Sequence, residues 1–349
     1  MRLIKRTDYL SINHIGNKCR DCADGSTKPS NICPIGDNYI APRWQVWYSF
    51  QVLITKSKGY ISRSRDVPSC TGLLNRPDNM DIMKSILSAA GFDASSGAGI
   101  IRDVDTFFSF GFHGIAVPTC TVIQGPQGVV KARASSGALF RDTLKAATRG
   151  VDLRGIKIGV LSNEVIIRAA AAFIESHKGI PVVFDPVFAA KNGISLITGK
   201  GISACRSLLF GKTTVLTPNA DEASIITGKR IRTVDEAKNA AEQIFSLGPQ
   251  AVVVKGGHLS GDPVDVFFDG TDFVLYEKKR FDAVIHGTGC SFSSTLICFL
   301  AAGHSVRDAF IATEGAFERL LGSRYRISED GYFYVSTASR QGMREACGE

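Results

Sequence analysis

Apolar and polar positions follow two different periodicities along most of this chain. From about residue 81 onward, short runs rich in Val and Ile are followed by longer segments in which apolar residues recur at helical spacing. The short runs predict strands at 82–89, 114–122, 156–161, 181–184, 214–216 and 251–255. The helical spacing predicts helices at 99–110, 163–177, 221–227, 234–247, 290–302 and 306–321.

Regular alternation of strands and helices is typical of a mainly parallel sheet with helices on both faces. We therefore expect the α/β fold class. Two further apolar runs, at 264–268 and 273–276, flank Asp269-Gly270, which predicts a hairpin. In open α/β sheets the ligand binds at the carboxyl ends of the strands, so candidate residues at those ends carry the most weight.

Residues 1–80 lack this alternation and are punctuated by Gly, Pro and polar residues. We predict an N-terminal extension at 1–80, one α/β domain at 81–325 and a C-terminal tail at 326–349. The extension holds 12 Lys and Arg against 6 Asp and no Glu, so it carries most of the chain's net charge of +8. Its basic residues are scattered singly, which argues against a nucleic-acid partner.

Composition narrows the class of protein further. With 44% hydrophobic and 21% charged residues, the chain can bury a sizeable core. A dense apolar run at 296–303 is far shorter than the roughly 18 residues of a membrane helix, so no membrane partner is expected. The nine cysteines are an odd count, which argues for reduced thiols and a cytoplasmic location. Cys19, Cys22 and Cys33 could be metal ligands or free thiols, and the sequence leaves both readings open.

The most informative motif is HGTGCS at 286–291, at the predicted start of a helix. Gly287 and Gly289 allow a tight turn, and the free N–H groups of the first turn, from Thr288 onward, form an anion hole. Such a hole suits the charge that develops on a transferring phosphoryl group. We expect Cys290 at its mouth, with a pKa lowered by the helix N-terminus. The alternative is a structural turn followed by a small buried Cys.

Polar residues follow two of the predicted strands. Asp185 comes directly after the run at 181–184, and is either a turn-capping residue or a functional carboxylate. Asn219 and Glu222 lie three apart after the run at 214–216. They predict either a helix N-cap with an acid near the dipole or a site for Mg²⁺ close to phosphate.

Lys255, Gly256 and Gly257 end a third strand and offer a cation and bare backbone to a nucleotide phosphate. The chain has no Walker A motif, and no GxGxxG follows a strand, so a P-loop or Rossmann site is disfavoured. A phosphoryl transferase of another architecture remains. The small residues at 90–99 would let a flat ligand approach the backbone, or form a flexible turn.

Together these segments resemble the ribokinase superfamily, and most closely the hydroxymethylpyrimidine/phosphomethylpyrimidine kinases of thiamine biosynthesis. The resemblance spans about residues 83–321. It is carried by AGFDASSGAGIIRDVDTF (90–107), VPTCTVIQGPQGV (117–129), KIGVL (157–161), DPV (185–187), TPNADEA (217–223), KGGH (255–258) and HGTGC (286–290). The chain departs from the family pattern at Ser96, Gly125, Pro126 and Val160, where the family usually has Gly, Asn, Thr and Met.

The resemblance implies a ribokinase-like fold and a kinase that uses ATP and Mg²⁺. Its substrates would be the small pyrimidine 4-amino-5-hydroxymethyl-2-methylpyrimidine and then the monophosphate, which becomes the diphosphate. A homodimer is also implied. Gln124 would bind the ring nitrogen and amino group of the pyrimidine, because an amide offers a donor and an acceptor. The substrate pocket would further contain Gly91, Asp93, Ala98, Val122 and Val187.

The resemblance also assigns the phosphoryl-transfer residues. Cys290 would approach the substrate hydroxyl while the amides of Gly287, Thr288, Gly289 and Cys290 itself stabilise the γ-phosphoryl group. The residues expected to hold Mg²⁺ are Asp185 and Glu222. The residues expected to hold ATP are Asn219, Lys255, Gly256 and Gly257.

Two other functions are compatible with the same motifs. One is a pyridoxal kinase of the same superfamily; Gln124 and the loop at 90–99 favour the pyrimidine instead. The other is a non-catalytic sensor that binds the pyrimidine, and the presence of Lys255, Asp185 and Glu222 argues against lost catalysis.

Overall fold

The computed structural model describes residues 82–125, 128–257, 259–278, 280, 285–326, 329 and 333–337. The predicted extension at 1–80 lies outside the described residues, and so do Cys19, Cys22 and Cys33 as candidate metal ligands. The proposed domain limits at residues 80 and 325 stay predictions. Among the described helices, none combines the length and the apolar character that a membrane-spanning segment requires.

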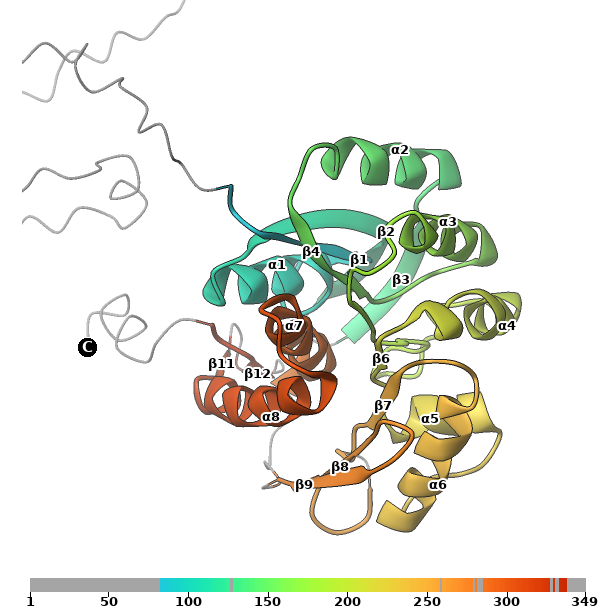
Figure 1. The fold of residues 1–349 in the computed structure, drawn as a ribbon, viewed down its shortest axis with the longest axis vertical. Helices are drawn as coiled ribbons and strands as arrows, with labels where there is room; N and C mark the ends of the chain where they lie inside the picture. Colours follow the sequence, from blue (N-terminus) through green and yellow to red (C-terminus); the bar gives the residue numbers. More distant parts are fainter. Residues whose placement is uncertain are drawn as a thin grey trace, which may run out of the picture. The chain divides into compact units, whose positions relative to one another are not determined.

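The described residues form a nine-stranded sheet in the order β3-β2-β1-β4-β5-β6-β7-β8-β9 (Figure 1). Six neighbouring strands are parallel: β2 (His113–Gly125), β1 (Ser85–Asp93), β4 (Leu153–Ile158), β5 (Val182–Phe184), β6 (Val215–Leu216) and β7 (Ala251–Val254). The antiparallel strands are β3 (Gly128–Ala134) at one edge and β8 (Val264–Phe268) and β9 (Phe273–Glu277) at the other. The predicted α/β fold and the predicted hairpin are confirmed.

Eight α-helices surround this sheet in the described part of the chain. They are α1 (Gly99–Ser109), α2 (Gly137–Ala147), α3 (Glu164–Glu175), α4 (Gly199–Leu208), α5 (Ala220–Thr227), α6 (Val234–Phe245), α7 (Thr288–Ala301) and α8 (Val306–Gly322). A second, small sheet holds β10 (Ile285–His286), β12 (Phe333–Tyr334) and β11 (Tyr325–Arg326) in that order. It places β12 directly beside the strand that leads into α7.

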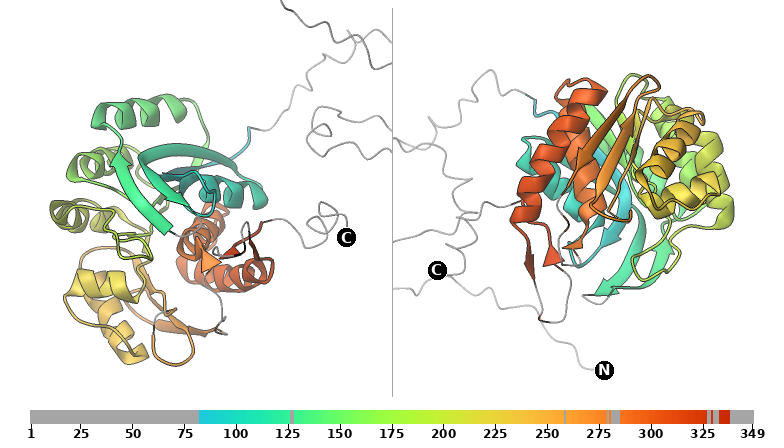
Figure 2. Two further views of the ribbon diagram at one scale, coloured as in Figure 1. Left: turned by 180° about the vertical axis from the view of Figure 1, so that it is seen from behind. Right: turned by 90° about the horizontal axis from the view of Figure 1, so that it is seen from below.

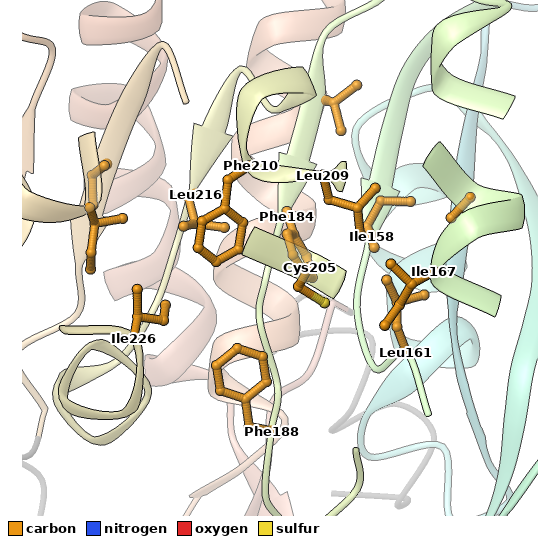
Figure 3. Packing of buried hydrophobic residues seen from close by; sticks show 14 of the residues in the cluster. Ile158, Leu161, Ile167, Phe184, Phe188, Cys205, Leu209, Phe210, Leu216 and Ile226 are labelled. Atoms are coloured by element: carbon orange, nitrogen blue, oxygen red, sulfur yellow. The ribbon is translucent and has the colours of Figure 1, made fainter. Parts of the chain in front are cut away.

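Alternation along the central strands divides the core into two layers. In β5, Val182 and Phe184 belong to the cluster beneath α2–α6, whereas Val183 belongs to the cluster beneath α1, α7 and α8. Period-two alternation sends successive side chains to opposite faces of a sheet, so one strand contributes to both clusters. Figure 2 shows the sheet between these two layers of helices, and Figure 3 shows Phe184 packed near Phe210 and Leu209 in the first cluster.

Among the longer elements, β3, α2 and α4 escape the sequence prediction. The short strands β10, β11 and β12 and a 3₁₀ turn at Phe210–Lys212 were not predicted either. Only Phe140 and Leu144 of α2 are buried, so its apolar stripe is narrow. The sequence of α4 begins Gly-Lys-Gly, and glycine weakens a helix signal. The predicted strand at 156–161 is found at Leu153–Ile158, so it starts and ends three residues earlier than predicted.

A buried cluster of charges supports the segment after β7. Asp265 of β8 accepts a hydrogen bond from the Gly256 N–H at 2.7 Å and one from the Lys278 ammonium at 2.6 Å. Lys278 also lies 2.6 Å from the carboxylate of Glu314, a fully buried residue of α8. Two carboxylates therefore share one ammonium. Burial, with Asp265 nearby, raises the pKa of Glu314 to about 9.

We expect the pH dependence of stability to change in a Glu314→Gln variant. Because the folded-state pKa of Glu314 lies far above its ordinary value of 4.5, the folded protein keeps a proton that the unfolded chain releases. The contribution of Glu314 to the free energy of unfolding therefore falls as pH rises between those values. Relative to wild type, the variant should gain about 1–2 kcal/mol between pH 6 and 8, measured by urea unfolding.

The matched control is Glu318→Gln, which removes an exposed carboxylate from the same helix. This control should follow the wild-type pH profile. A stability difference between Glu314→Gln and wild type that is constant from pH 5 to 9 would contradict a protonated Glu314.

Candidate active site

The predicted polar residues gather at the carboxyl edge of the parallel strands. Asp93 is the last residue of β1, and Gln124 is the next to last of β2. Asp185 follows β5 directly, and Lys255 follows β7. Asn219, after β6, forms a parallel bridge with Lys255, so these two strand ends are in register. The edge that α/β sheets use for ligands is thus the edge where the candidate residues lie.

An ion pair stands at the centre of this edge. The Lys255 ammonium lies 2.6 Å from a carboxylate oxygen of Asp185. Asp185 is fully buried and also accepts hydrogen bonds from the hydroxyls of Thr217 and Ser293 at 3.3 and 3.4 Å. Burial by itself would lower the pKa of Lys255, but Asp185 and Glu222 together hold it above its ordinary value. Lys255 is therefore a cation at neutral pH.

Asn219 and Glu222 form the helix cap that was one of the two predicted readings. The Asn219 side chain accepts a hydrogen bond from the Glu222 N–H at 2.9 Å, and Glu222 accepts one from the Asn219 N–H at 2.8 Å. This reciprocal pair is a capping box at the start of α5. Burial raises the pKa of Glu222 to about 8, against the opposing charge of Lys255. Within the described ranges, no group of three or more His, Cys, Asp or Glu is arranged to hold a metal by itself.

The start of α7 is shaped by glycine. Gly287 has a φ of 74°, and a Cβ there would lie 1.8 Å from the Gly97 carbonyl oxygen, so only glycine fits. A Cβ on Gly289 would lie 3.1 Å from the Lys255 ammonium and 3.4 Å from Asp185. The first turn of α7 therefore faces the ion pair directly. Its leading N–H groups have no partners within the helix and are suited to an anion.

The expected pKa of Cys290 is wrong in direction. Burial raises the pKa of this thiol to about 11, although the Lys157 charge and a hydrogen bond from the Gly99 N–H act in the opposite sense. The negative charges of Asp103 and Asp185 raise it further. A helix N-terminus lowers a thiol pKa only when its effect exceeds the cost of desolvating the thiolate. At neutral pH Cys290 is a thiol.

A buried ion pair behind Cys290 was not assigned a role from the sequence. The Lys157 ammonium of β4 lies 3.0 and 2.9 Å from the two carboxylate oxygens of Asp103 of α1, and both side chains are fully buried. Asp103 also accepts hydrogen bonds from the hydroxyls of Ser88 and Ser294 at 2.6 and 2.7 Å. The cluster joins β1, α1, β4 and α7. The available signal was a lysine within the apolar run predicted at 156–161.

The ring-binding candidates also meet. Gln124 Nε2 lies 3.2 Å from His286 Nε2, and the same ring nitrogen lies 3.2 Å from Asp93 Oδ2. Burial alone would raise the pKa of Asp93, but hydrogen bonds from His286, Gln124 and Ser95 lower it to about 2. Asp93 is thus an anion. His286 belongs to the HGTGC motif, but no local pattern of residues predicts that it lies beside Gln124.

Apolar walls adjoin this polar group. Val122 belongs to a small apolar cluster against which Val160 and Val187 pack. A Cβ on Gly91 would lie 3.0 Å from Val122, so the glycine keeps this wall open. The Ala98 N–H donates to Asp93 at 2.9 Å. The structure therefore brings these predicted residues close together at the ends of β1 and β2.

The raised pKa of Cys290 predicts that its thiol is alkylated efficiently only at high pH. In the native protein, we expect the rate of Cys290 alkylation by iodoacetamide to rise mainly between about pH 9 and 11, read peptide by peptide by mass spectrometry. In the urea-unfolded chain the rise should centre near pH 8.5. Cys298, which is buried on the same helix, is the control and should stay unmodified. Its alkylation would indicate that the helix opens locally. A native half-maximal rate below pH 8 would contradict the raised pKa.

Comparison with known proteins agrees with this arrangement. A family model described as phosphomethylpyrimidine kinase matches residues 93–328. The hydroxymethylpyrimidine/phosphomethylpyrimidine kinase of Aquifex aeolicus is 36% identical over 252 residues, covering 70% of this chain and 98% of its own. The Streptomyces coelicolor protein of the same name is 33% identical over 239 residues, covering 68% and 87%.

Two solved structures are similar in fold. The phosphomethylpyrimidine kinase of Clostridium difficile has a TM-score of 0.61 at 29% identity, covering 68% of this chain and 99% of its own. An ADP complex of Bacillus subtilis pyridoxal kinase has a TM-score of 0.68 at 29% identity, covering 74% and 99%. The match of the family model over residues 93–328, with the motif residues gathered at one sheet edge, shows that this chain belongs to the phosphomethylpyrimidine kinase family and has its ribokinase-like fold.

Proposed function

We propose that this protein transfers the γ-phosphoryl group of ATP to the hydroxyl of 4-amino-5-hydroxymethyl-2-methylpyrimidine, and a second one to the monophosphate. One observation carries the proposal. The ring of His286 lies 3.2 Å from the Gln124 amide, and His286 directly precedes Gly287 at the start of α7. The amide expected to recognise the ring therefore contacts the residue that directly precedes the anion hole, and phosphoryl transfer to a substituent on a small ring requires the two to be close.

The chemistry asks mainly for position and charge. Phosphoryl transfer passes through a loose transition state whose charge is spread over the phosphoryl oxygens. The amides at the start of α7 would stabilise that charge, and Lys255, held by Asp185, would add a fixed cation beside Gly289. The Gly256 N–H already donates a hydrogen bond to Asp265, so it would not bind a phosphate. Gly256 would instead let the nucleotide approach the backbone closely, because glycine has no side chain.

The residues at this edge fit a magnesium ion. Asp185 and Glu222 both lie close enough to Lys255 to act on its charge, and the raised pKa of Glu222 means that a nearby dication would favour its carboxylate form. Mg²⁺ in kinases is bound through one or two carboxylates together with substrate phosphates. Asp185 and Glu222 would hold it, and Asn219 would lie beside the nucleotide phosphates. When bound, the ion would neutralise charge on the phosphates of ATP.

Cys290 remains the candidate next to the substrate hydroxyl. As a thiol it already carries its own proton, so it can act as a base only in its thiolate form. A loose transition state does not require the hydroxyl to lose its proton before transfer, so the Cys290 thiolate, which the Lys157 charge favours, would accept that proton only late in the step. The amides of the same turn act throughout the transfer.

A homodimer is the expected assembly. Three large apolar side chains are exposed at the same end of three neighbouring strands, Phe92 of β1, Ile123 of β2 and Val130 of β3. Val130 is 74% exposed. A second copy of the chain would cover such a face. The expected cytoplasmic location stays a prediction.

Pyridoxal phosphorylation is the second candidate function. Structures of pyridoxal kinase from Bacillus subtilis and from Staphylococcus aureus have TM-scores of 0.68 and 0.67 against this chain, higher than the 0.61 of the Clostridium difficile phosphomethylpyrimidine kinase. A similar fold does not show whether pyridoxal or the hydroxymethylpyrimidine is the substrate. The choice between these two aromatic alcohols depends on the groups that face the ring. A pyrimidine-binding sensor without catalysis is the third candidate.

Parallel assays with three substrates test the proposal. ATP consumption should occur with hydroxymethylpyrimidine and with its monophosphate, and should fall at least roughly tenfold in Gln124→Leu because the amide contacts are lost. Turnover of pyridoxal alone would show that the protein is a pyridoxal kinase and would contradict the proposal. Binding of the pyrimidine without any ATP turnover would favour the sensor.

A Cys290→Ala variant tests the role of the thiol. If Cys290 accepts the substrate proton, kcat should fall by roughly 10²- to 10⁴-fold with little change in KM. Cys290→Ser keeps a small polar side chain and should recover part of the loss. Near-normal kcat in Cys290→Ala would leave the amides of α7 as the catalytic feature.

A further inference from the structure

The carboxylate of Asp93 is surrounded by donors from the protein itself. Its side chain is 3% exposed. Oδ1 accepts hydrogen bonds from the N–H and the hydroxyl of Ser95, both at 2.8 Å, and Oδ2 accepts one from the Ala98 N–H at 2.9 Å. His286 Nε2 lies 3.2 Å from Oδ2 as well. A buried carboxylate paired on both oxygens is suited to holding other groups rather than a substrate.

The charge of Asp93 fixes which nitrogen of His286 carries a proton. Because Asp93 is ionised, the ring nitrogen that faces it must donate, so His286 Nε2 bears hydrogen. The Gln124 amide nitrogen lies 3.2 Å from that ring nitrogen, and Gln124 also hydrogen-bonds Asp93. Two donors, from His286 and Gln124, therefore converge on the Asp93 carboxylate.

This convergence fixes the direction of the Gln124 amide. The reverse orientation would bring the amide oxygen against an ionised carboxylate, which is electrostatically unfavourable. With its nitrogen turned to Asp93, the amide oxygen lies on the opposite side. One N–H of the amide is used by Asp93, which leaves the oxygen and the second N–H for a ligand.

The His286 ring itself is held in place from two directions. It makes an edge contact with Tyr334 of β12, with ring centroids 5.7 Å apart. A Cβ on Gly97 would lie 2.2 Å from the ring, so the 93–99 loop packs tightly against it. The hydrogen-bonding nitrogen of His286 is therefore fixed relative to both Asp93 and Gln124.

We propose that Asp93 and His286 are positioning residues that turn the Gln124 amide so that it accepts ring substrates with an amino group beside a ring nitrogen, and rejects the corresponding oxo compounds. This inference rests on the proposed function and changes the role of Asp93 from substrate contact to orientation. A 4-aminopyrimidine offers a donor and then an acceptor, which matches the amide oxygen and its N–H. A 4-oxopyrimidine offers the reverse pattern and would leave both amide groups unsatisfied.

The test compares 4-amino-5-hydroxymethyl-2-methylpyrimidine with its 4-oxo analogue as phosphoryl acceptors. Wild-type protein should favour the amino compound in kcat/KM. In Asp93→Asn, the new NH₂ group faces Gln124, so the Gln124 amide turns and the amino-to-oxo ratio should fall roughly ten- to hundredfold. The matched control is Ser95→Ala, which removes a hydrogen bond from the other oxygen of Asp93 and should leave the ratio unchanged.

The ratio separates orientation from simple structural damage. Asp93→Asn that lowers kcat/KM equally for both compounds would overturn the inference. If Asp93→Asn does not fold, as judged by thermal unfolding, His286→Phe keeps a ring against Tyr334 and Gly97 but removes the donor to Asp93. The ratio should fall in that variant too, and an unchanged ratio would overturn the inference. Failure of the proposed function has a different signature, namely no turnover of the amino compound by wild type.

Discussion

The backbone contact between the loop at 93–99 and the start of α7 is the constraint on which the site depends. At Gly287 a Cβ would lie 1.8 Å from the Gly97 carbonyl oxygen, and at Gly99 it would lie 2.1 Å from the Gly91 carbonyl oxygen. Both glycines have positive φ, so neither the space nor the conformation admits a side chain. This contact sets the distance between the ring pocket and the anion hole, and phosphoryl transfer depends on that distance.

Two buried ion pairs then fix the helix that carries the anion hole. Consecutive serines of α7 hydrogen-bond to different aspartates, Ser293 to Asp185 and Ser294 to Asp103. Each aspartate pairs with a lysine, Lys255 or Lys157. Burying ion pairs costs desolvation, so such pairs add little net stability. Their contribution here is geometric, because they hold α7 against the ends of β4, β5 and β7 and place positive charge on both sides of its first turn.

Local chemistry could be predicted wherever short stretches of sequence specify it. The strands, the hairpin and helices with a wide apolar stripe were predicted, whereas α2 and α4 were missed because two buried residues or two glycines give a weak pattern. Asn219 and Glu222 allowed two readings, since a capping box and a magnesium site use the same residues. The cap is seen in the structure, and the metal role stays a proposal.

The sequence by itself determined the α/β fold, the family and the residue types at the carboxyl ends of the strands, because these depend on periodicity and on motifs of a few adjacent residues. Tertiary structure alone decided the protonation of Cys290, whose burial outweighs the helix N-terminus. It also decided the partners of Gln124 and Asp93, which meet His286 across 162 and 193 residues of sequence. Desolvation and long-range contact depend on how distant segments pack, and no local pattern of residues records that packing.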